Sequence, residues 1–330
     1  MNKEKDASAS FFIITEAKER LSLSEKTKKW LAANCAVSLK GKTVVVTGAN
    51  SGVGFKTAET MLYLGADVVM ACRNRRKAEE AKAKLLEDYP GANITLMELD
   101  LASFASIDAF VKRLEEQKTD VSVFVNNAGV FHRPGEKTAD GFDLVIGTNY
   151  LGVYRLTEKL LPYLQSLPHE TVYINTVSII AKVARDVDYG DFYLSKKPKN
   201  MSVYARSKIC LARYTCALAE RLGDGSVRVL MNHPGIALTP LGLNAYGKTV
   251  KRLSRVFGGI FNSPEKSSLS VAYIMSHSVP DGSLIGPKKL FGGWGYPKPN
   301  RIPRRFKKGA DELAAFSEGE MSAARPAEAR

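Results

Sequence analysis

Residues 43–54 read Thr-Val-Val-Val-Thr-Gly-Ala-Asn-Ser-Gly-Val-Gly, so a β-branched run passes directly into a glycine-rich segment that precedes a helix-compatible stretch. Strand, glycine loop and helix in this order bring backbone N–H groups and the positive end of a helix under a pyrophosphate. Gly48 suits a sharp turn, Gly52 the close approach of a ligand, and Gly54 the packing of helix on strand. An ordinary glycine-rich turn is the alternative interpretation. The predicted dinucleotide contacts in this loop are Gly48, Asn50, Ser51, Gly52, Val53 and Gly54.

Short β-branched runs alternate with helical stretches along most of the chain, which is typical of βαβ units and a parallel sheet. We therefore expect an α/β fold of the Rossmann type, doubly wound, with a mostly parallel seven-stranded sheet and helices on both faces. The expected strands are 43–46, 67–71, 94–98, 121–125, 171–176, 226–231 and 289–291.

The chain has 330 residues, which suits a single catalytic domain with terminal extensions. We expect a helical N-terminal extension over 1–40 that docks on a domain spanning 41–295. A substrate lid is expected at about 240–265, and a basic, then low-complexity tail over 296–330.

Two stretches and the C-terminus are expected to lack regular structure. Residues 182–202 are charged and turn-prone, and residues 280–308 are interrupted by prolines, so both are interpreted as loops. Residues 309–330 are rich in Ala, Glu and Ser, a composition that predicts disorder.

The composition favours a reducing, cytoplasmic setting. Four scattered cysteines suit neither a disulfide framework nor a metal centre. The apolar run at 11–14 is too short for a signal peptide or a membrane span. A formal net charge of +14 could reflect an anionic cofactor, nucleic acid or an anionic membrane surface. Because no nucleic-acid-binding motif is present, we expect no nucleic-acid partner.

The end of the second expected strand should meet the adenosine ribose of a bound dinucleotide. Residues 71–77 read Ala-Cys-Arg-Asn-Arg-Arg-Lys, with no acid to bind the 2′-hydroxyl. Basic residues in the first turn of a helix oppose its dipole, and a bound anion would explain them. A solvated basic face is the alternative. Arg73 and Asn74 are therefore predicted cofactor contacts.

Two further segments follow expected strands at the edge where open α/β sheets bind ligands. Asp100 and Leu101 follow the third strand, and Asn127, Ala128 and Gly129 follow the fourth. Asp100 could hold the adenine edge through its neighbouring backbone, or it could cap the next helix.

Three side chains further along suit proton transfer. Ser178 ends the fifth expected strand, and Tyr204 and Lys208 lie four residues apart, hence on one helix face. An ammonium beside a phenol favours the phenolate and would lower the pKa of Tyr204 from about 10, which makes a usable proton donor and acceptor. A Tyr-x-x-x-Lys pair taken alone is more often a surface pair. Its position after the glycine loop and Ser178 favours the catalytic interpretation.

Together, these motifs resemble the short-chain dehydrogenase/reductase family over roughly residues 40–295. The resemblance implies that Tyr204 exchanges a proton with the substrate oxygen and that Ser178 hydrogen-bonds this oxygen. Lys208 would lower the pKa of Tyr204 and hold the nicotinamide ribose, and Asn149 would complete a proton relay through water. It further implies NADP(H) as cofactor, a homodimer, and a clasp on the nicotinamide carboxamide formed by Pro234, Gly235 and Thr239.

Within the family, segments 47–52, 71–74, 140–142 and 233–235 are most similar to the retinol dehydrogenases and protochlorophyllide reductase. The similarity implies carbonyl–alcohol interconversion on a lipophilic substrate such as a retinoid or steroid. Reduction of a carbon–carbon double bond and a non-catalytic dinucleotide-binding regulator are the alternatives. A regulator would not need Ser178, Tyr204, Lys208 and Asn149 together.

Two segments suggest reversible contact with an anionic membrane surface. Apolar residues recur at helical spacing over 249–261, with basic residues on the other faces. Residues 288–308 hold eight basic side chains, no acidic one, and interleaved aromatic rings. Basic amphipathic helices and basic–aromatic loops bind anionic lipid. The alternative is a helix that only closes the substrate pocket, followed by a solvated or subunit-contacting segment.

Overall fold

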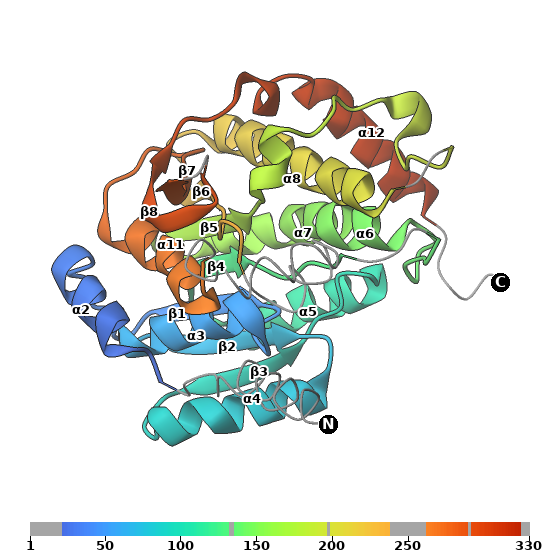
Figure 1. The fold of residues 1–330 in the computed structure, drawn as a ribbon. Helices are drawn as coiled ribbons and strands as arrows, with labels where there is room; N and C mark the ends of the chain where they lie inside the picture. The colour runs from blue at the N-terminus through green and yellow to red at the C-terminus, as the bar shows by residue number, and fades with distance from the viewer. Residues whose placement is uncertain (1–21, 132–134, 197–198, 238–261, 290–291, 325–330) are drawn as a thin grey trace, which may run out of the picture.

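The computed structural model describes residues 22–131, 135–196, 199–237, 262–289 and 292–324. Within these residues, eight strands form one sheet in the order β3-β2-β1-β4-β5-β6-β7-β8 (Figure 1). All neighbouring pairs are parallel except the last, β7 with β8. The strands are β1 (Thr43–Thr47), β2 (Asp67–Cys72), β3 (Ile94–Glu98), β4 (Val121–Asn126), β5 (Thr171–Thr176), β6 (Val227–Asn232), β7 (Leu284–Lys289) and β8 (Trp294–Asn300).

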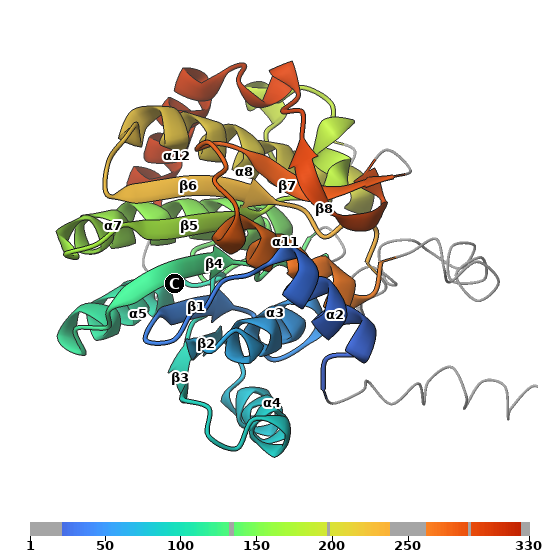
Figure 2. The ribbon, with the colours of Figure 1, turned by 90° about the vertical axis from the view of Figure 1, so that its left-hand side faces the viewer.

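Helices cover both faces of the sheet (Figure 2). On β1, Val45 packs into one core, whereas Val44 and Val46 pack into the other, because successive side chains point to opposite faces. Helices α5, α7 and α8 cover the first core, and α3, α4 and α11 cover the second. The helices are α2 (Glu25–Asn34), α3 (Gly52–Tyr63), α4 (Arg75–Asp88), α5 (Phe104–Glu116), α6 (Leu144–Ile146), α7 (Gly152–Ser166), α8 (Asn200–Leu222), α11 (Pro264–Ser276) and α12 (Ala310–Ala323).

The doubly wound, mostly parallel sheet is confirmed, with eight strands in place of the expected seven. The strand expected at 289–291 is wrong in position, since β7 ends at Lys289 and residues 290–291 lie outside the described part. Strand β8 overturns the loop interpretation of 280–308. Its prolines, Pro297 and Pro299, are tolerated because β8 is an edge strand and needs no hydrogen bonds on its outer side.

The prediction of disorder over 309–330 is wrong for residues 310–323, which form α12. Leu313 on this helix is buried, and the hydroxyl of Ser317 hydrogen-bonds that of Tyr150 over 2.6 Å. Phe316 packs on Phe192. A weak composition signal is overridden here by contacts with residues more than a hundred positions away.

The N-terminal segment is described from residue 22 and packs helix α2 against α11. Ser24 caps α2 and gives both its N–H and its hydroxyl to Glu265. Leu23 and Leu31 are buried in the second core. The expected lid at 240–265 lies outside the described residues, apart from 262–265, which lead into and begin α11. Of the helices described, none has the length and apolar character needed to span a bilayer.

Candidate active site

A cleft of about 600 Å³ opens at the carboxyl ends of the parallel strands. This edge collects ligands in doubly wound sheets because the strand order reverses there, between β1 and β4. Of the predicted site residues, those that line it are Gly48, Asn50, Ser51, Gly52, Val53, Gly54, Arg73, Asn74, Asp100, Leu101, Asn127, Ala128, Gly129, Ser178, Tyr204, Lys208, Pro234 and Gly235. Asn149 lies behind the cleft wall, and Thr239 lies outside the described residues.

The glycine loop between β1 and α3 requires its glycines. Gly48 and Gly52 have positive φ angles of 67° and 59°, which favour glycine. A Cβ on Gly54 would lie 2.4 Å from the carbonyl oxygen of Gly48 and from Nδ2 of Asn127. The loop is therefore closely packed, with the first N–H groups of α3 beside the cleft.

Asn127 and Thr47 hold this loop against the segment after β4. The Thr47 hydroxyl accepts hydrogen bonds from the backbone N–H groups of Asn127 (3.0 Å) and Ala128 (2.9 Å). The Asn127 side chain donates to the Thr47 carbonyl over 2.9 Å. Asn127 thus positions the loop, a task that the sequence did not reveal because the contact joins two distant strands.

The basic segment after β2 divides into paired and cleft-lining residues. Asn74 caps α4 by accepting a hydrogen bond from the Lys77 N–H. Arg75 pairs with Glu79 over 2.9 Å, and Arg76 pairs with Glu80, so these two arginines match the solvated-face interpretation. Arg73 and Lys77 instead line the cleft. Sequence reasoning missed Lys77, although it follows Arg73 by four residues, a spacing that brings two side chains to the same side of a helix.

Asp100 and its neighbours form a turn at the end of β3. The Asp100 carboxylate accepts a hydrogen bond from the Ala102 N–H over 2.9 Å, whereas Ser103 is the cap of α5. The carboxylate therefore holds the turn, and it does so while lining the cleft.

Asn149 lies in a π-helical turn, Gly147–Leu151, and is fully buried. Its Oδ1 accepts from the Val130 N–H over 2.7 Å, and its Nδ2 donates to the Val130 carbonyl over 2.9 Å. Nδ2 also lies 3.2 Å from the hydroxyl of Ser207 on α8. Asn149 therefore joins the segment after β4 to the helix that carries Tyr204. Single-turn π-helices of this kind often occur at functional sites.

Helix α8 carries both Tyr204 and Lys208. Lys208 is buried and donates to the Thr176 carbonyl over 2.9 Å. Burial lowers the pKa of Lys208 to about 8, because water no longer stabilises its charge. Its Nζ lies 6.0 Å from the ring centre of Tyr204. The rings of Phe131 and Tyr204 pack edge to face, with 5.4 Å between ring centres.

Ser178 lies at the end of β5, where the chain turns into a short 3-10 helix, Ile179–Lys182. Its hydroxyl accepts a 3.4 Å hydrogen bond from the Ile180 N–H. Ser178 and Tyr204 both line the cleft.

The segment after β6 is held from the opposite side. The Pro234 carbonyl accepts from Nδ2 of Asn262 (3.1 Å) and from the hydroxyl of Ser267 (2.8 Å). Gly235 has a φ of 76°, and a Cβ there would lie 2.6 Å from the Gly293 carbonyl oxygen. Sequence reasoning also missed the apolar part of the cleft lining, because segments far apart in the chain supply it: Val130, Ile179, Ile180, Met201, Ile236 and Ala237.

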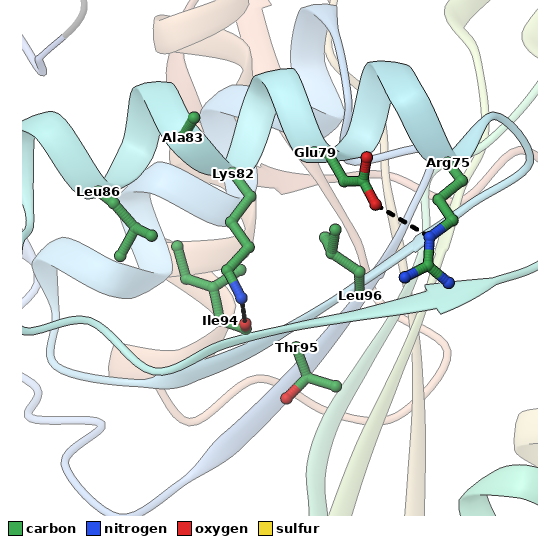
Figure 3. A pocket seen from close by; sticks show the side chains of 8 residues that line it. All are labelled: Arg75, Glu79, Lys82, Ala83, Leu86, Ile94, Thr95 and Leu96. Atoms are coloured by element: carbon green, nitrogen blue, oxygen red, sulfur yellow. Dashed lines mark hydrogen bonds and ion pairs between the residues drawn. The ribbon is translucent and has the colours of Figure 1, made fainter.

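A second hollow of similar volume lies between α4 and the edge strand β3 (Figure 3). Its basic side chains already have partners: Arg75 binds Glu79, and Lys82 donates to the Ile94 carbonyl. None of the predicted catalytic residues lines it, so we assign the chemistry to the cleft. The lining residues are Arg75, Glu79, Lys82, Ala83, Leu86, Ile94, Thr95 and Leu96.

Comparison with known sequences identifies relatives over most of the chain. The family model described as short chain dehydrogenase matches residues 42–246. Retinol dehydrogenase 14 of Mus musculus is 36% identical over 250 residues, which cover 72% of this chain and 74% of the relative. Retinol dehydrogenase 13 of Homo sapiens is 34% identical over 243 residues, covering 72% of each chain.

Solved structures share the fold. A putative uncharacterized protein from Mycobacterium Paratuberculosis has a TM-score of 0.70 and 30% identity, covering 88% of this chain and 97% of its own. A short chain dehydrogenase from Burkholderia cenocepacia J2315 in complex with NADP has a TM-score of 0.59 and 24% identity, covering 74% and 96%.

Proposed function

The chain belongs to the short-chain dehydrogenase family, and from this premise we propose that it is an NADP(H)-dependent oxidoreductase that interconverts a carbonyl and an alcohol on a lipophilic substrate. The proposed catalytic residues are Asn149, Ser178, Tyr204 and Lys208. The observation that carries the proposal is that Tyr204, Ser178 and the glycine loop line a single cleft, with buried Lys208 beside the Tyr204 ring.

The cleft fits a dinucleotide. The loop at Gly48 and Gly52 presents backbone N–H groups at the start of α3, as a pyrophosphate requires. Arg73 and Lys77 line the same cleft after β2, the neighbour of β1, where two cations suit the 2′-phosphate that distinguishes NADP(H) from NAD(H). When bound, the nicotinamide supplies or accepts the hydride.

The protein's own residues move the proton. In the reducing direction, the Tyr204 hydroxyl gives its proton to the substrate oxygen, and in the oxidising direction it takes that proton back. Ser178 donates a hydrogen bond to the same oxygen and stabilises the negative charge that develops there. The Lys208 ammonium favours the phenolate of Tyr204 between these steps. Asn149 fixes the backbone around Val130 and links it to α8 for a proton relay through water.

The apolar lining supports a lipophilic substrate. Ile179, Ile180 and Met201 line the cleft together with Ser178 and Tyr204, and Phe131 packs against the Tyr204 ring. Such surfaces bind apolar molecules through the hydrophobic effect. We therefore propose a retinoid, a steroid or a comparable ketone or alcohol as substrate, in agreement with the retinol dehydrogenases among the relatives. Cytoplasmic location, reversible membrane contact and a homodimer stay predictions.

Incubation of the purified protein with NADPH and a panel of ketones, aldehydes and enones tests the proposal. We expect oxidation of NADPH with apolar ketones or aldehydes, and the alcohol as product. Tyr204→Phe should retain NADPH binding and lose turnover, because the ring still packs but the exchangeable proton is gone. A Phe variant that keeps most of the activity would contradict the assigned role of Tyr204, and turnover of enones alone would point to reduction of a carbon–carbon bond.

A further inference from the structure

Helix α2, the start of α11 and strands β7 and β8 lie on the left of Figure 1. Their side chains form a cluster of aromatic rings and ammonium groups. Trp30 and Tyr296 stack with ring centres 5.0 Å apart and an angle of 3°. The Lys266 ammonium lies 4.7 Å from the Tyr296 ring centre and 4.6 Å from that of Trp294. We call this the cation–aromatic face; its members are Lys26, Trp30, Lys266, Lys289, Trp294 and Tyr296.

Positive charge predominates on this face. Lys26 and Lys289 are exposed, and both lie close enough to oppose the charge of Lys266, whose pKa is lowered by burial and by these two neighbours. Across the described part of the chain, no ion pair involves these three lysines. Of the adjacent carboxylates, Glu25 pairs with Lys28. Glu265 accepts two hydrogen bonds from the neutral Ser24 and keeps its charge, which offsets only one of the three lysines. Mutual repulsion of this kind is relieved by an anionic partner.

The face adjoins the cleft. Lys289 ends β7 and pairs with Trp294 at the start of β8, so both lie at the edge of the sheet where the cleft opens. Gly293, next to Trp294, accepts a hydrogen bond from Ile236 of the cleft wall. Ser267, next to Lys266, donates to the Pro234 carbonyl.

We propose that the cation–aromatic face docks the protein on a membrane surface that carries anionic phospholipid, with the cleft entrance beside the lipid. Indole and phenol rings favour the boundary between water and lipid, and lysines attract anionic headgroups. Helix α2 supplies Lys26 and Trp30, so the N-terminal segment becomes part of the docking surface. Membrane docking itself does not depend on the proposed function. Only its biological role does, because a lipophilic substrate is concentrated in the membrane.

The chain offers an internal probe, because its two tryptophans, Trp30 and Trp294, both lie on this face. The full chain without cofactor is mixed with vesicles of phosphatidylcholine, with or without phosphatidylserine, that contain a brominated lipid as quencher. We expect flotation with the anionic vesicles, tryptophan quenching in the bound state, and loss of both at high salt. Binding without quenching would mean that another face docks and would overturn the proposal.

The triple variant K26Q/K266Q/K289Q should bind anionic vesicles about a hundredfold more weakly, at about fivefold for each lysine. K84Q/K112Q/K159Q removes the same charge from exposed lysines on α4, α5 and α7 and should bind as the unchanged protein does. NADPH binding and thermal unfolding verify that both variants are folded. Equal binding by the two variants would overturn the proposal, as would lysine-dependent binding to a DNA or RNA duplex with no binding to vesicles.

Failure of the proposed function would be recognised separately. Vesicle binding is measured without substrate or cofactor, and ketone reduction is measured with a water-soluble ketone and no vesicles. An inactive protein that binds anionic vesicles through this face leaves the docking intact, and an active protein that ignores them refutes the docking alone.

Discussion

Replacing Lys208 by methionine should stabilise the fold while it abolishes turnover. Lys208 is buried, and burial lowers its pKa from 10.5 to about 8. This difference corresponds to about 3 kcal/mol of cost for a charged lysine in the folded state. Methionine fills a similar volume without charge, but it leaves the Thr176 carbonyl without its 2.9 Å hydrogen bond, a loss of about 1–2 kcal/mol. We expect a net gain of about 1–2 kcal/mol at neutral pH.

The pH dependence follows from the direction of the pKa change. Below pH 8 the lysine is charged in both the folded and the unfolded chain, so the cost is fully present. Between pH 8 and 10.5 the folded protein loses this proton first, and the cost disappears. The advantage of Lys208→Met should therefore be constant below pH 8 and shrink above it.

Thermal unfolding without cofactor measures this advantage, and NADPH-dependent reduction of a ketone measures the activity. A gain of this size corresponds to an increase in Tm of about 2–6 °C. Tyr204→Phe is the control, because it should lose activity without a comparable gain in stability. A Lys208→Met variant that unfolds several degrees below the unchanged protein, or an advantage that grows above pH 8, would refute the reasoning.

Three further predictions concern other parts of the molecule. Arg73→Ala should weaken NADPH binding about tenfold or more and leave NADH binding unchanged, and Lys77→Ala should have a smaller effect in the same direction. Fluorescence titration with each cofactor measures this, and equal losses for both cofactors would contradict the assignment. Gly54→Ala should destabilise the fold by about 1–3 kcal/mol in denaturant unfolding, because its Cβ would lie 2.4 Å from the Gly48 carbonyl oxygen, whereas Gly91→Ala has open space and should not. Burial and the nearby Lys182 ammonium lower the pKa of His233 from 6.5 to about 3, so this residue takes up a proton in the unfolded chain before it does so in the folded one. The free energy of unfolding should therefore fall by about 2 kcal/mol as the pH falls from 6.5 to about 5. His233→Asn should flatten that part of the stability profile, and an unchanged slope would argue against a neutral, buried His233.

Local signals were sufficient to predict the first half of the fold. The alternation of β-branched runs and helices, together with the glycines at 48, 52 and 54, indicates a strand–turn–helix unit, because backbone geometry there depends on the residues themselves. The i, i+4 spacing likewise predicts that Tyr204 and Lys208 share one helix face, because this follows from the helical repeat alone. The C-terminal region was misjudged, since prolines at 297 and 299 and an alanine-rich tail are ambiguous until their neighbours are known.

The sequence by itself determined the family, the mostly parallel sheet and the main residues at the cleft, because these follow from local periodicity and from motifs of fixed spacing. Only the tertiary structure decided which polar groups are already engaged. It shows that Asn127 holds Thr47, that Arg75 and Arg76 pair with glutamates, and that Lys208 is buried. It also brings Trp30 against Tyr296, a residue 266 positions further along the chain. Such contacts depend on how distant segments pack, and no local pattern in the chain specifies them.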